Sequence, residues 1–501
     1  MIALLQRIND YVWGVPALLM ILVSGIYLSV RSRFVQLRCL SAAFRLFLHR
    51  LRKRSSEEGG VTPFQSLCTA LAATVGTGNI AGVAGAICIG GPGAVFWLLI
   101  SALLGMVIKF SEVTLAMLYQ RRTPDGHLHG GPMYMIEQGM GGKYRLLACI
   151  YCFLGVFAAF GVGNATQVNA VIGAINEAFA LDGSVVRDVL LGSVLAAAVG
   201  VSLLGGAKRI GLIAERLIPF AAAAYIVLGA GVILVNYRSI PRVLSSIFVG
   251  AFSPSAVTGG VVGSAFLALR TGISRGVFTN EAGMGTASMS YTGARVSHPE
   301  EQGLMGMVEV FVDTVVICSI TALAILCSGI PIPYGSDAGA VLTTRAFSGV
   351  YGSLGTLLLA AFLCCFAFAT MLGWGLYGIR CAQYLFGERA WKPFVIVQMG
   401  VITACSALGT GTVWLLAETM NGLMAIPNLI AVIYLSPVLL RLIQNHHDVT
   451  DDVSVDGGTN ESFDQCKSLR TVSYEKIPPL CGGSGTPGKA DLSSQHRSAR
   501  Y

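Results

Sequence analysis

Long apolar runs recur along this chain, and each is long enough to cross a lipid bilayer as a helix. About 20 apolar residues, at about 1.5 Å of rise each, are needed to cross about 30 Å of hydrocarbon. Only 12% of the residues are charged and the mean hydropathy is +0.68, whereas soluble proteins average about 25% charged residues. The pattern predicts an all-α polytopic membrane protein, with the lipid bilayer as its surroundings.

About eleven of these runs are expected to be transmembrane helices. The first is too long for the apolar region of a signal peptide, and its basic cluster follows it rather than precedes it, so we expect a retained helix. The expected helices lie near residues 11–30, 65–90, 93–120, 146–175, 186–206, 213–236, 259–293, 303–328, 354–386, 393–411 and 414–441.

Basic residues are distributed unevenly among the loops. The segment between the first two helices carries the densest basic run, from Arg31 to Arg54, and the positive-inside rule places it in the cytoplasm. We therefore expect a multi-pass protein of the plasma (inner) membrane, with its N-terminus outside and its C-terminal tail in the cytoplasm. Because these loops account for the formal charge of +8, no nucleic-acid partner is expected.

The expected helices group into segments. After residue 441 the composition becomes polar with few apolar residues, which predicts a segment that cannot fold alone. The expected segments are an extra N-terminal transmembrane helix (1–30), a basic cytoplasmic loop (31–64), a first five-helix repeat (65–236), a second five-helix repeat (259–441) and a disordered cytoplasmic tail (442–501).

Two of the expected helices carry glycine and polar residues near their middle, at Ala72–Gly82 and Thr271–Gly283. Every backbone polar group in hydrocarbon needs a partner, so non-helical backbone at that depth must be buried in protein or line a cavity. The breaks lie about two hundred residues apart and each opens a group of five helices, as in an inverted repeat that binds substrate and ions at discontinuous helices. The alternative is that the glycines only allow close helix packing. We expect a five-plus-five inverted repeat with two discontinuous helices.

The first break has a chemical consequence. A half-helix that begins after Gly76 presents unpaired N–H groups and the positive end of its dipole, which suits a carboxylate. The half-helix that ends before Gly76 presents unpaired carbonyl oxygens, which are the ligands that hard cations prefer. This break is therefore expected to hold an anionic group and a cation side by side.

Ionisable residues also occur within apolar runs. At the second break, Arg275 and Glu281 are expected to lie on either side, with Glu281 at the start of the second half-helix, either as a charge pair that holds the break open or in contact with a substrate. Lys109 and Glu112 share a helix face and are expected to neutralise each other.

Glu309 and Asp313 also share a helix face, but their charges have the same sign. Two carboxylates at this spacing repel each other. The pair therefore predicts a nearby cation or a protonated carboxyl group, and the sequence leaves the roles of these two residues and of Glu281 open.

Several motifs resemble the alanine or glycine:cation symporter family, and the resemblance covers about residues 1–441. They are Gly76–Gly82, Gly90–Leu98, His129–Tyr134, Thr279–Gly285 and Val312–Thr314. Leu98 and Leu99 depart from the pair usual in the family, which we expect to affect packing more than ligand choice. The resemblance implies a sodium-coupled symporter, not an enzyme, that imports small neutral amino acids such as alanine and glycine, with the fold of the neurotransmitter-type sodium symporters and Na⁺ as the coupling ion.

The resemblance also implies site residues. One sodium site would use Thr74, Asn79 and Thr279, and a second would use main-chain oxygens of Ala72 and Val75 with Thr370. The expected substrate-binding residues are Thr77, Gly78, Asn79, Gln167, Phe278, Met371 and Trp374. For Gln167, Phe278, Met371 and Trp374, ordinary packing or hydrogen bonding between helices is the alternative.

Other functions remain as alternatives. A proton-coupled carrier would use Glu281 or Asp313, and a passive channel would be expected to show a repeated pore-lining motif. A membrane-embedded enzyme would need a nucleophile or metal motif, and neither Gly-x-Ser-x-Gly nor HExxH occurs; His127 and His129 are expected to be solvated. The sequence leaves open the preferred amino acid, the ion stoichiometry and the oligomeric state.

Overall fold

The structure is a computed structural model that describes residues 2–452, except for 15, 53–60, 124–127, 182–183, 295, 297, 337–338 and 409. Residues Met1–Asp456 form a first compact unit, separate from residues 457–501. The expected tail beyond residue 452 lies outside the described residues, as does His127.

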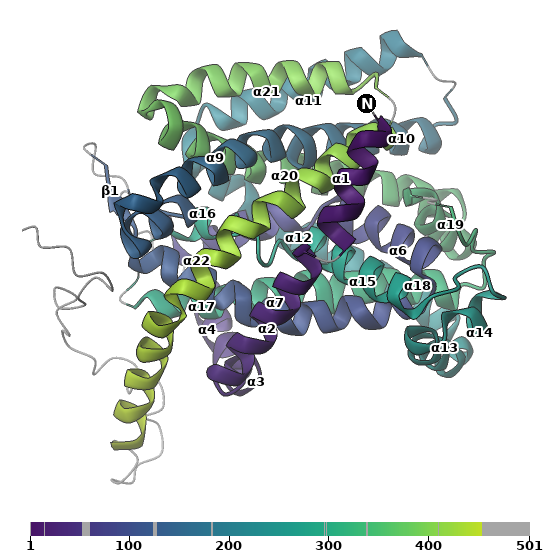
Figure 1. Cartoon of the computed structure of the whole chain (residues 1–501). Helices are drawn as coiled ribbons and strands as arrows, with labels where there is room; N and C mark the ends of the chain where they lie inside the picture. Colours follow the sequence, from purple (N-terminus) through teal and green to yellow (C-terminus); the bar gives the residue numbers. More distant parts are fainter. Residues whose placement is uncertain are drawn as a thin grey trace, which may run out of the picture. The chain divides into compact units, whose positions relative to one another are not determined.

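The first unit is almost entirely helical (Figure 1). Its α-helices are α1 (Ile2–Gly14), α2 (Pro16–Arg31), α3 (Val35–Arg38), α4 (Leu40–Arg52), α5 (Pro63–Thr74), α6 (Val83–Gly90), α7 (Gly93–Leu118), α8 (Pro132–Tyr134), α9 (Arg145–Phe160), α10 (Thr166–Ala178), α11 (Val185–Leu203), α12 (Gly206–Val235), α13 (Ile240–Phe252), α14 (Pro254–Thr258), α15 (Ala265–Asn280), α16 (Ser288–Tyr291), α17 (Pro299–Val310), α18 (Ser319–Cys327), α19 (Gly339–Tyr351), α20 (Ser353–Phe386), α21 (Trp391–Cys405) and α22 (Thr410–Asp452).

Shorter elements connect or extend these helices. They are the helical segments η1 (Gly78–Gly82), η2 (Met135–Met140), η3 (Gly142–Tyr144), η4 (Gly161–Ala165), η5 (Tyr237–Ser239), η6 (Phe311–Cys318) and η7 (Glu388–Ala390), and the strands β1 (Arg121–Arg122) and β2 (Leu128–His129). The strands form an antiparallel pair in which Arg121 lies opposite His129.

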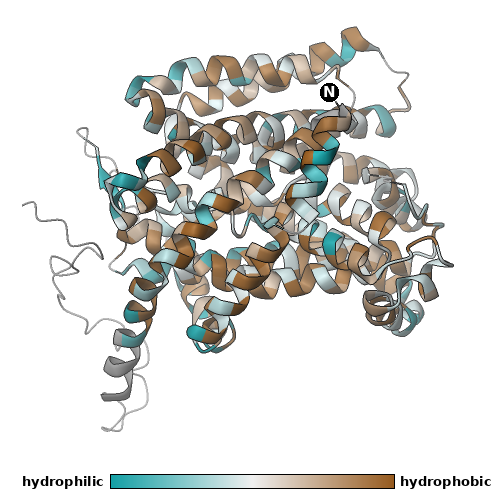
Figure 2. Ribbon diagram, in the orientation of Figure 1, coloured by the Kyte–Doolittle hydropathy of each residue, from teal (hydrophilic) through white to brown (hydrophobic). Residues whose placement is uncertain are grey.

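Eight helices of the described part are long and apolar enough to cross a membrane, and nine if the bent pair α5 and η1–α6 is one span. Figure 2 shows the apolar residues along most of their length. Two expected spans fall short of this criterion, because α15 has 16 residues before it is interrupted and α21 has 15 residues. The described residues therefore form a polytopic helical protein with eight to nine helices suited to cross a membrane.

Two expected boundaries differ from those observed. The segment expected as a basic loop is largely helical, because α3 and α4 lie within it. Helix α4 is strongly amphipathic and packs its apolar side on the protein through Phe44, which meets Phe311, and Phe47, which meets Phe64. Helix α22 continues past the expected end at Arg441 as far as Asp452.

Helices α7 and α20 form the centre of the packing. Helix α7 packs along α15 and α17, and α20 packs on α5, α9 and α10. Helix α20 approaches α5 closely at Gly373, where a Cβ atom would lie 2.7 Å from the Cβ of Ala73. Segments distant in sequence are thereby brought against the end of α5, where the chain is interrupted.

The start of α5 is fixed by a capping box. The Thr62 hydroxyl accepts a hydrogen bond from the Gln65 backbone N–H at 3.1 Å, and the Gln65 side chain accepts one from the Thr62 N–H at 3.1 Å. Pro63 occupies the first helical position, where its missing N–H costs nothing.

Thr62→Ala is expected to lower the stability of the protein by about 1 kcal/mol, because it removes this N-cap. The measurement is the midpoint of thermal unfolding of the detergent-solubilised protein. Thr62→Ser keeps the hydroxyl and serves as the control, and a decrease of equal size in both variants would show that the hydroxyl is not what matters.

Candidate binding site at the interrupted helices

The first predicted break is present. Helix α5 ends at Thr74, Val75 is extended with φ −76° and ψ 92°, and the chain becomes helical again at Gly78 with its axis bent by 50°. The side chain of Asn79 folds back over the break, and its Oδ1 accepts a hydrogen bond from the Gly76 N–H at 2.9 Å. The buried break is thus stabilised by a side chain from its own second half.

One side of the break faces α20 and α10. The Thr370 hydroxyl donates a hydrogen bond to the Ala72 carbonyl oxygen at 3.0 Å. A Cβ atom on Gly76 would lie 2.6 Å from Thr370 Oγ1 and 3.5 Å from Gln167 Oε1. The structure therefore places Thr370, Ala72 and Gln167 together at Gly76, and the buried Gln167 Oε1 has no hydrogen-bond partner among the described residues.

The other side of the break faces the end of α15. A Cβ atom on Gly78 would lie 3.0 Å from Thr279 Cγ2 and 3.3 Å from Phe278 Cδ1. The Thr279 hydroxyl donates to the Gly276 carbonyl oxygen at 2.8 Å, so its oxygen can still accept a hydrogen bond or bind a cation. The Thr77 hydroxyl is buried here and has no partner among the described residues.

Thr74 is the last residue of α5 and immediately precedes the break. Its hydroxyl donates to the Ala70 and Leu71 carbonyl oxygens of its own helix, at 3.2 and 3.4 Å. These bonds orient the oxygen, whose lone pairs remain available.

Asp313 joins this group, although the sequence did not assign it to the site. Asn79 Nδ2 donates to Asp313 Oδ1 at 2.7 Å, and the Thr314 hydroxyl donates to Asp313 Oδ2 at 2.7 Å. Asn79 and Asp313 are both fully buried. The sequence signal was the pairing of Glu309 with Asp313 on one helix face, but nothing local linked Asp313 to Asn79.

The donor set at the break suits a small hard cation. It consists of carboxylate, amide, hydroxyl and carbonyl oxygens from Asp313, Asn79, Thr279, Thr370 and Ala72, and oxygen ligands are those that hard cations prefer. A carboxylate in hydrocarbon is costly unless it is paired. Asp313 has two side-chain hydrogen-bond donors but no basic side chain of the described residues within 4 Å, so a bound cation would complete the neutralisation of its charge.

The second predicted break is displaced from its expected place. Helix α15 is continuous through Asn280, and the interruption begins at Glu281, which has φ 54° in the left-handed region. The interruption lies at the end of the expected stretch because Gly272 and Gly276 serve packing: a Cβ on Gly272 would lie 2.3 Å from the Ala94 carbonyl oxygen, and one on Gly276 would lie 1.9 Å from Ser101 Oγ. These glycines let α7 approach α15 closely.

The charge pair expected between Arg275 and Glu281 is replaced by other contacts. Arg275 lies inside α15 and forms an ion pair with Glu418 of α22. Glu281 caps the end of α15 rather than starting a second half-helix, and its Oε2 accepts a hydrogen bond from the Thr286 hydroxyl at 2.5 Å. Arg275 and Glu281 are therefore each paired with a different residue instead of with each other.

A buried charge pair lies behind the second break. Lys109 was expected to pair with Glu112, but its Nζ lies 3.4 Å from Glu309 Oε1, with both side chains fully buried. Glu112 instead accepts a hydrogen bond from Asn428 Nδ2 at 2.6 Å, and the same nitrogen donates to the Gly283 carbonyl oxygen at 2.9 Å. Lys109 is thus the cation that the sequence predicted near Glu309.

Three further predicted positions lie in the surrounding core. Met371 and Trp374 are fully buried in the same apolar cluster as Phe278. Trp374 packs on Gly163, where a Cβ would lie 2.3 Å from the Trp374 Cβ. Gln398 Nε2 donates to Asn164 Oδ1 at 3.0 Å and to the Met371 carbonyl oxygen at 3.3 Å.

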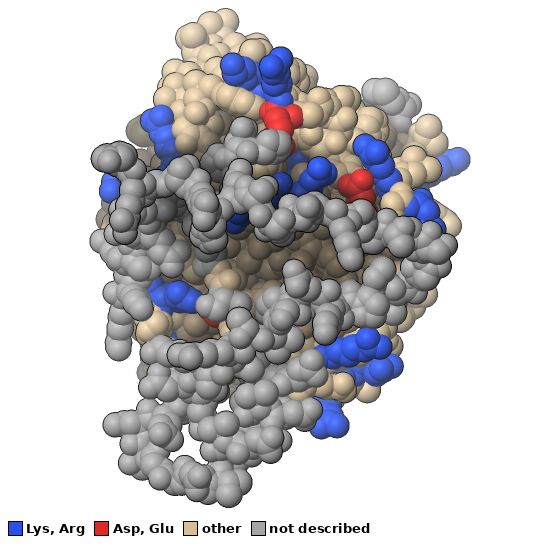
Figure 3. All heavy atoms as spheres, turned by 90° about the vertical axis from the view of Figure 1, so that its left-hand side faces the viewer, with Lys and Arg blue, Asp and Glu red and all other residues tan. Residues whose placement is uncertain are grey.

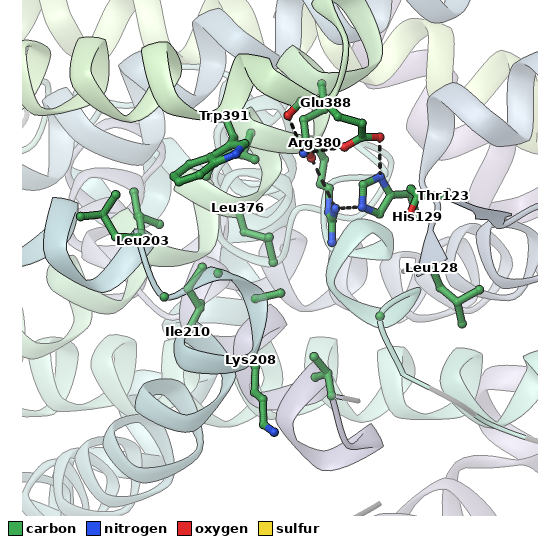
Figure 4. Close-up of a pocket in the computed structure, with 18 of the residues that line it drawn as sticks. Thr123, Leu128, His129, Leu203, Lys208, Ile210, Leu376, Arg380, Glu388 and Trp391 are labelled. Atoms are coloured by element: carbon green, nitrogen blue, oxygen red, sulfur yellow. Dashed lines mark hydrogen bonds and ion pairs between the residues drawn. The ribbon is translucent and has the colours of Figure 1, made fainter. Parts of the chain in front are cut away.

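A cavity of about 610 Å³ opens beyond Trp374 along α20, and none of the predicted site residues lines it. Figure 4 shows Arg380 in its wall, in contact with His129, whose other ring nitrogen lies 3.7 Å from Glu388 Oε1. His129 was expected to be solvated but is buried. On the face that lies to the left in Figure 1, Lys and Arg side chains surround a recess (Figure 3).

An interrupted helix with a buried anion, a set of oxygen donors and a nearby cavity defines a polytopic helical membrane transporter. The chain belongs to the sodium:alanine symporter family, whose model matches residues 1–456.

Individual relatives agree with this. Sodium/alanine symporter AgcS of Methanococcus maripaludis is 39% identical over 447 residues, which cover 88% of this chain and 96% of AgcS. The probable sodium/glutamine symporter GlnT of Bacillus subtilis is 36% identical, with 87% and 89% covered. The crystal structure of MhsT in complex with L-phenylalanine superimposes with a TM-score of 0.54 at 12% identity and covers 77% of this chain and 99% of MhsT, which shows a shared fold.

Proposed function

We propose that this protein is a sodium-coupled symporter that imports small neutral amino acids, such as alanine and glycine, by alternating access. The observation that carries the proposal is the contact of the first break with two oxygen-rich groups. Asn79 and Asp313 lie on one side, and Ala72 and Thr370 lie on the other. Substrate and ions that share one break are bound together, which couples their movements.

Each group has a proposed ligand. Thr74, Asn79 and Thr279, now with Asp313, would bind one sodium ion near the substrate carboxylate. Ala72, Val75 and Thr370 would bind a second. Thr77 and Gly78 begin the second half-helix, where backbone N–H groups and the positive dipole end favour a carboxylate.

The remaining predicted residues would shape the substrate pocket. Gln167 places an unpartnered oxygen at Gly76, where it would accept a hydrogen bond from the substrate ammonium group. Phe278 would cover the substrate, and Met371 and Trp374 would form the apolar wall that admits a methyl group.

The proposed topology follows from the same fold. Eleven spans would comprise an extra N-terminal helix and two five-helix repeats, 65–236 and 259–441. The protein would lie in the plasma (inner) membrane with its N-terminus outside, so that the basic loops and the cavity face the cytoplasm.

The test is uptake of radiolabelled alanine into proteoliposomes under an inward sodium gradient. A tenfold gradient is worth about 1.4 kcal/mol per ion, so one coupled ion at zero membrane potential would accumulate alanine about tenfold and two would accumulate it about a hundredfold. Uptake in sodium-free buffer driven by an acid-outside gradient would instead support a proton-coupled carrier. Flux that never saturates or concentrates would support a channel.

Gly76→Ala is expected to reduce sodium-dependent uptake by at least about tenfold. The added methyl would lie 2.6 Å from Thr370 Oγ1, so it would displace this hydroxyl from the Ala72 carbonyl oxygen and weaken the second ion site. Uptake should be normalised to the protein present in the membrane.

Gly82→Ala is the matched control, because this glycine lies in the same segment and its Cβ would meet no atom within 4 Å. Uptake by this variant should equal that of the wild type. If both variants lose uptake equally, the loss is caused by reduced flexibility of the segment and not by the contact with Thr370.

A further inference from the structure

We propose that the cavity beyond Trp374 contains a second amino-acid subsite, in which Arg380 binds the substrate carboxylate at the cytoplasmic face. This inference rests on the proposed function, because it concerns the path of the same substrate. The cavity is lined by Leu376, Ile379, Arg380 and Gln383 of α20, so it adjoins the central site along one helix. Six residues separate Trp374 from Arg380, which corresponds to about 9 Å along the helix axis.

The charges of the cavity favour an anion. Its charged lining residues are Lys208, Arg380, Arg389 and Glu388, so basic side chains outnumber the acidic one. A concave surface of one sign raises the local concentration of the opposite charge. An anionic group would therefore be attracted into the cavity from the solvent.

Arg380 has N–H groups that form no hydrogen bond to the described residues. Both of its hydrogen bonds to described residues use Nη1, one to His129 Nε2 and one to Gln383 Oε1 at 3.4 Å. No carboxylate of the described residues lies within 4 Å of its guanidinium group. Its Nη2 and Nε atoms donate no hydrogen bond to the described residues, and both are accessible to solvent. Figure 4 shows the guanidinium group pointing away from Glu388. This edge of the guanidinium fork is free to bind a carboxylate with two parallel hydrogen bonds.

The neighbours of Arg380 keep this edge free. Arginine can only donate, so His129 Nε2 must accept and the ring carries its proton on Nδ1, which lies 3.7 Å from Glu388 Oε1. Glu388 Oε2 accepts a further hydrogen bond from Gln383 Nε2 at 2.8 Å. The imidazole ring and Gln383 therefore hold the carboxylate of Glu388 away from the guanidinium group.

The rest of the cavity complements a zwitterion with a small side chain. Glu388 supplies the negative charge that a substrate ammonium group requires. Leu203, Leu376, Ile379 and Trp391 supply apolar walls for a methyl group. Arg380 would thus bind the carboxylate of a neutral amino acid, and Glu388 would bind its ammonium group, before the amino acid reaches the cytoplasm.

The experiment measures the KM for alanine separately at the two faces, with intact cells for the outer face and inverted membrane vesicles for the cytoplasmic face. Arg380→Gln is expected to raise the cytoplasmic KM about tenfold, because a charge-assisted bidentate contact is lost, and to leave the outer KM within about twofold. Arg380→Lys keeps the charge but loses the fork, so an intermediate increase is expected. Arg145, whose side chain is 71% exposed, does not line the cavity, so Arg145→Gln should change neither KM by more than about twofold.

Propionate, a carboxylate without an ammonium group, is the direct probe. It should inhibit alanine entry at the cytoplasmic face of the wild type, lose most of this effect in Arg380→Gln and lose part of it in Arg380→Lys. An unchanged cytoplasmic KM in Arg380→Gln, an equal increase at both faces, or no inhibition of the wild type by propionate would each overturn the subsite. The propionate measurement on the wild type tests the subsite even if Arg380→Gln does not fold. Absence of sodium-driven alanine uptake by the wild type would instead reject the proposed function.

Discussion

Asn79→Ala is expected to abolish sodium-dependent alanine uptake, with a decrease of at least about a hundredfold, while the protein still reaches the membrane. The substitution removes buried hydrogen bonds on both sides of the side chain. The Gly76 N–H loses its acceptor at 2.9 Å, and Asp313 loses one of its two side-chain donors, at 2.7 Å. Each buried group left without a partner costs about 1–3 kcal/mol, and about 2.8 kcal/mol corresponds to a hundredfold change.

Asn79→Asp separates the two contacts. An aspartate can still accept from the Gly76 N–H, but it cannot donate to Asp313 and would add a second negative charge beside it. If the geometry of the break alone matters, Asn79→Asp should retain much of the uptake. If the side chain belongs to the ion site, uptake should be lost or should require much more sodium, because the substitution changes the charge around the ion.

Asn169→Ala is the matched control for loss of a buried asparagine. Asn169 Nδ2 donates to the Cys405 carbonyl oxygen at 2.5 Å, between α10 and α21. Its removal tests stability without touching the first break. Uptake by Asn79→Ala that matches the wild type, or an equal loss in Asn169→Ala, would contradict the assignment of Asn79 to the site.

The first break was predictable because its signals are local. Gly76 and Gly78 lie two residues apart with threonine and asparagine beside them. Polar groups within hydrocarbon must be hydrogen-bonded inside the protein or line a cavity. Position within the family then implied Thr370 as a partner of Ala72, and this contact is present. Local composition and the resemblance together were enough to predict that these two residues lie close to each other.

The second break shows where local signals fail. Glycine at Gly272 and Gly276 suggested an interruption, but both glycines let α7 approach α15, and the chain turns only at Glu281. Glycine serves helix packing as well as helix breaks. Only the position of the neighbouring helix distinguishes the two uses, and the sequence of one segment does not contain that information.

The contacts that were missed all join distant parts of the chain. Asp313 lies 234 residues from Asn79, and His129 lies 251 residues from Arg380. Periodicity places a residue on a face of its own helix but does not say which helix that face meets. The role of Asp313 and the burial of His129 therefore emerged only from the tertiary structure.

Lys109→Met is expected to destabilise the protein by about 3–5 kcal/mol, the cost of leaving a buried charge without its partner. Lys109 Nζ lies 3.4 Å from Glu309 Oε1, and both side chains are fully buried between α7 and α17. Methionine fills a similar volume, so the effect comes from the charge and not from a cavity. The measurement is the midpoint of thermal unfolding in detergent, with the exposed Lys143→Met as the control that should change little.

The double variant Lys109→Met with Glu309→Gln identifies the cause. Glutamine at 309 is neutral, and its oxygen can still accept the hydrogen bond that Tyr291 donates to Glu309 Oε2 at 2.8 Å. The double variant should recover at least half of the lost stability, because a buried ion pair is often replaceable by neutral groups although its halves are not. A double variant no more stable than Lys109→Met would mean that the Lys109 charge is balanced mainly by Glu112 and Glu281, which also interact with it electrostatically. In that case α7 would be tied to the second break more tightly than to α17.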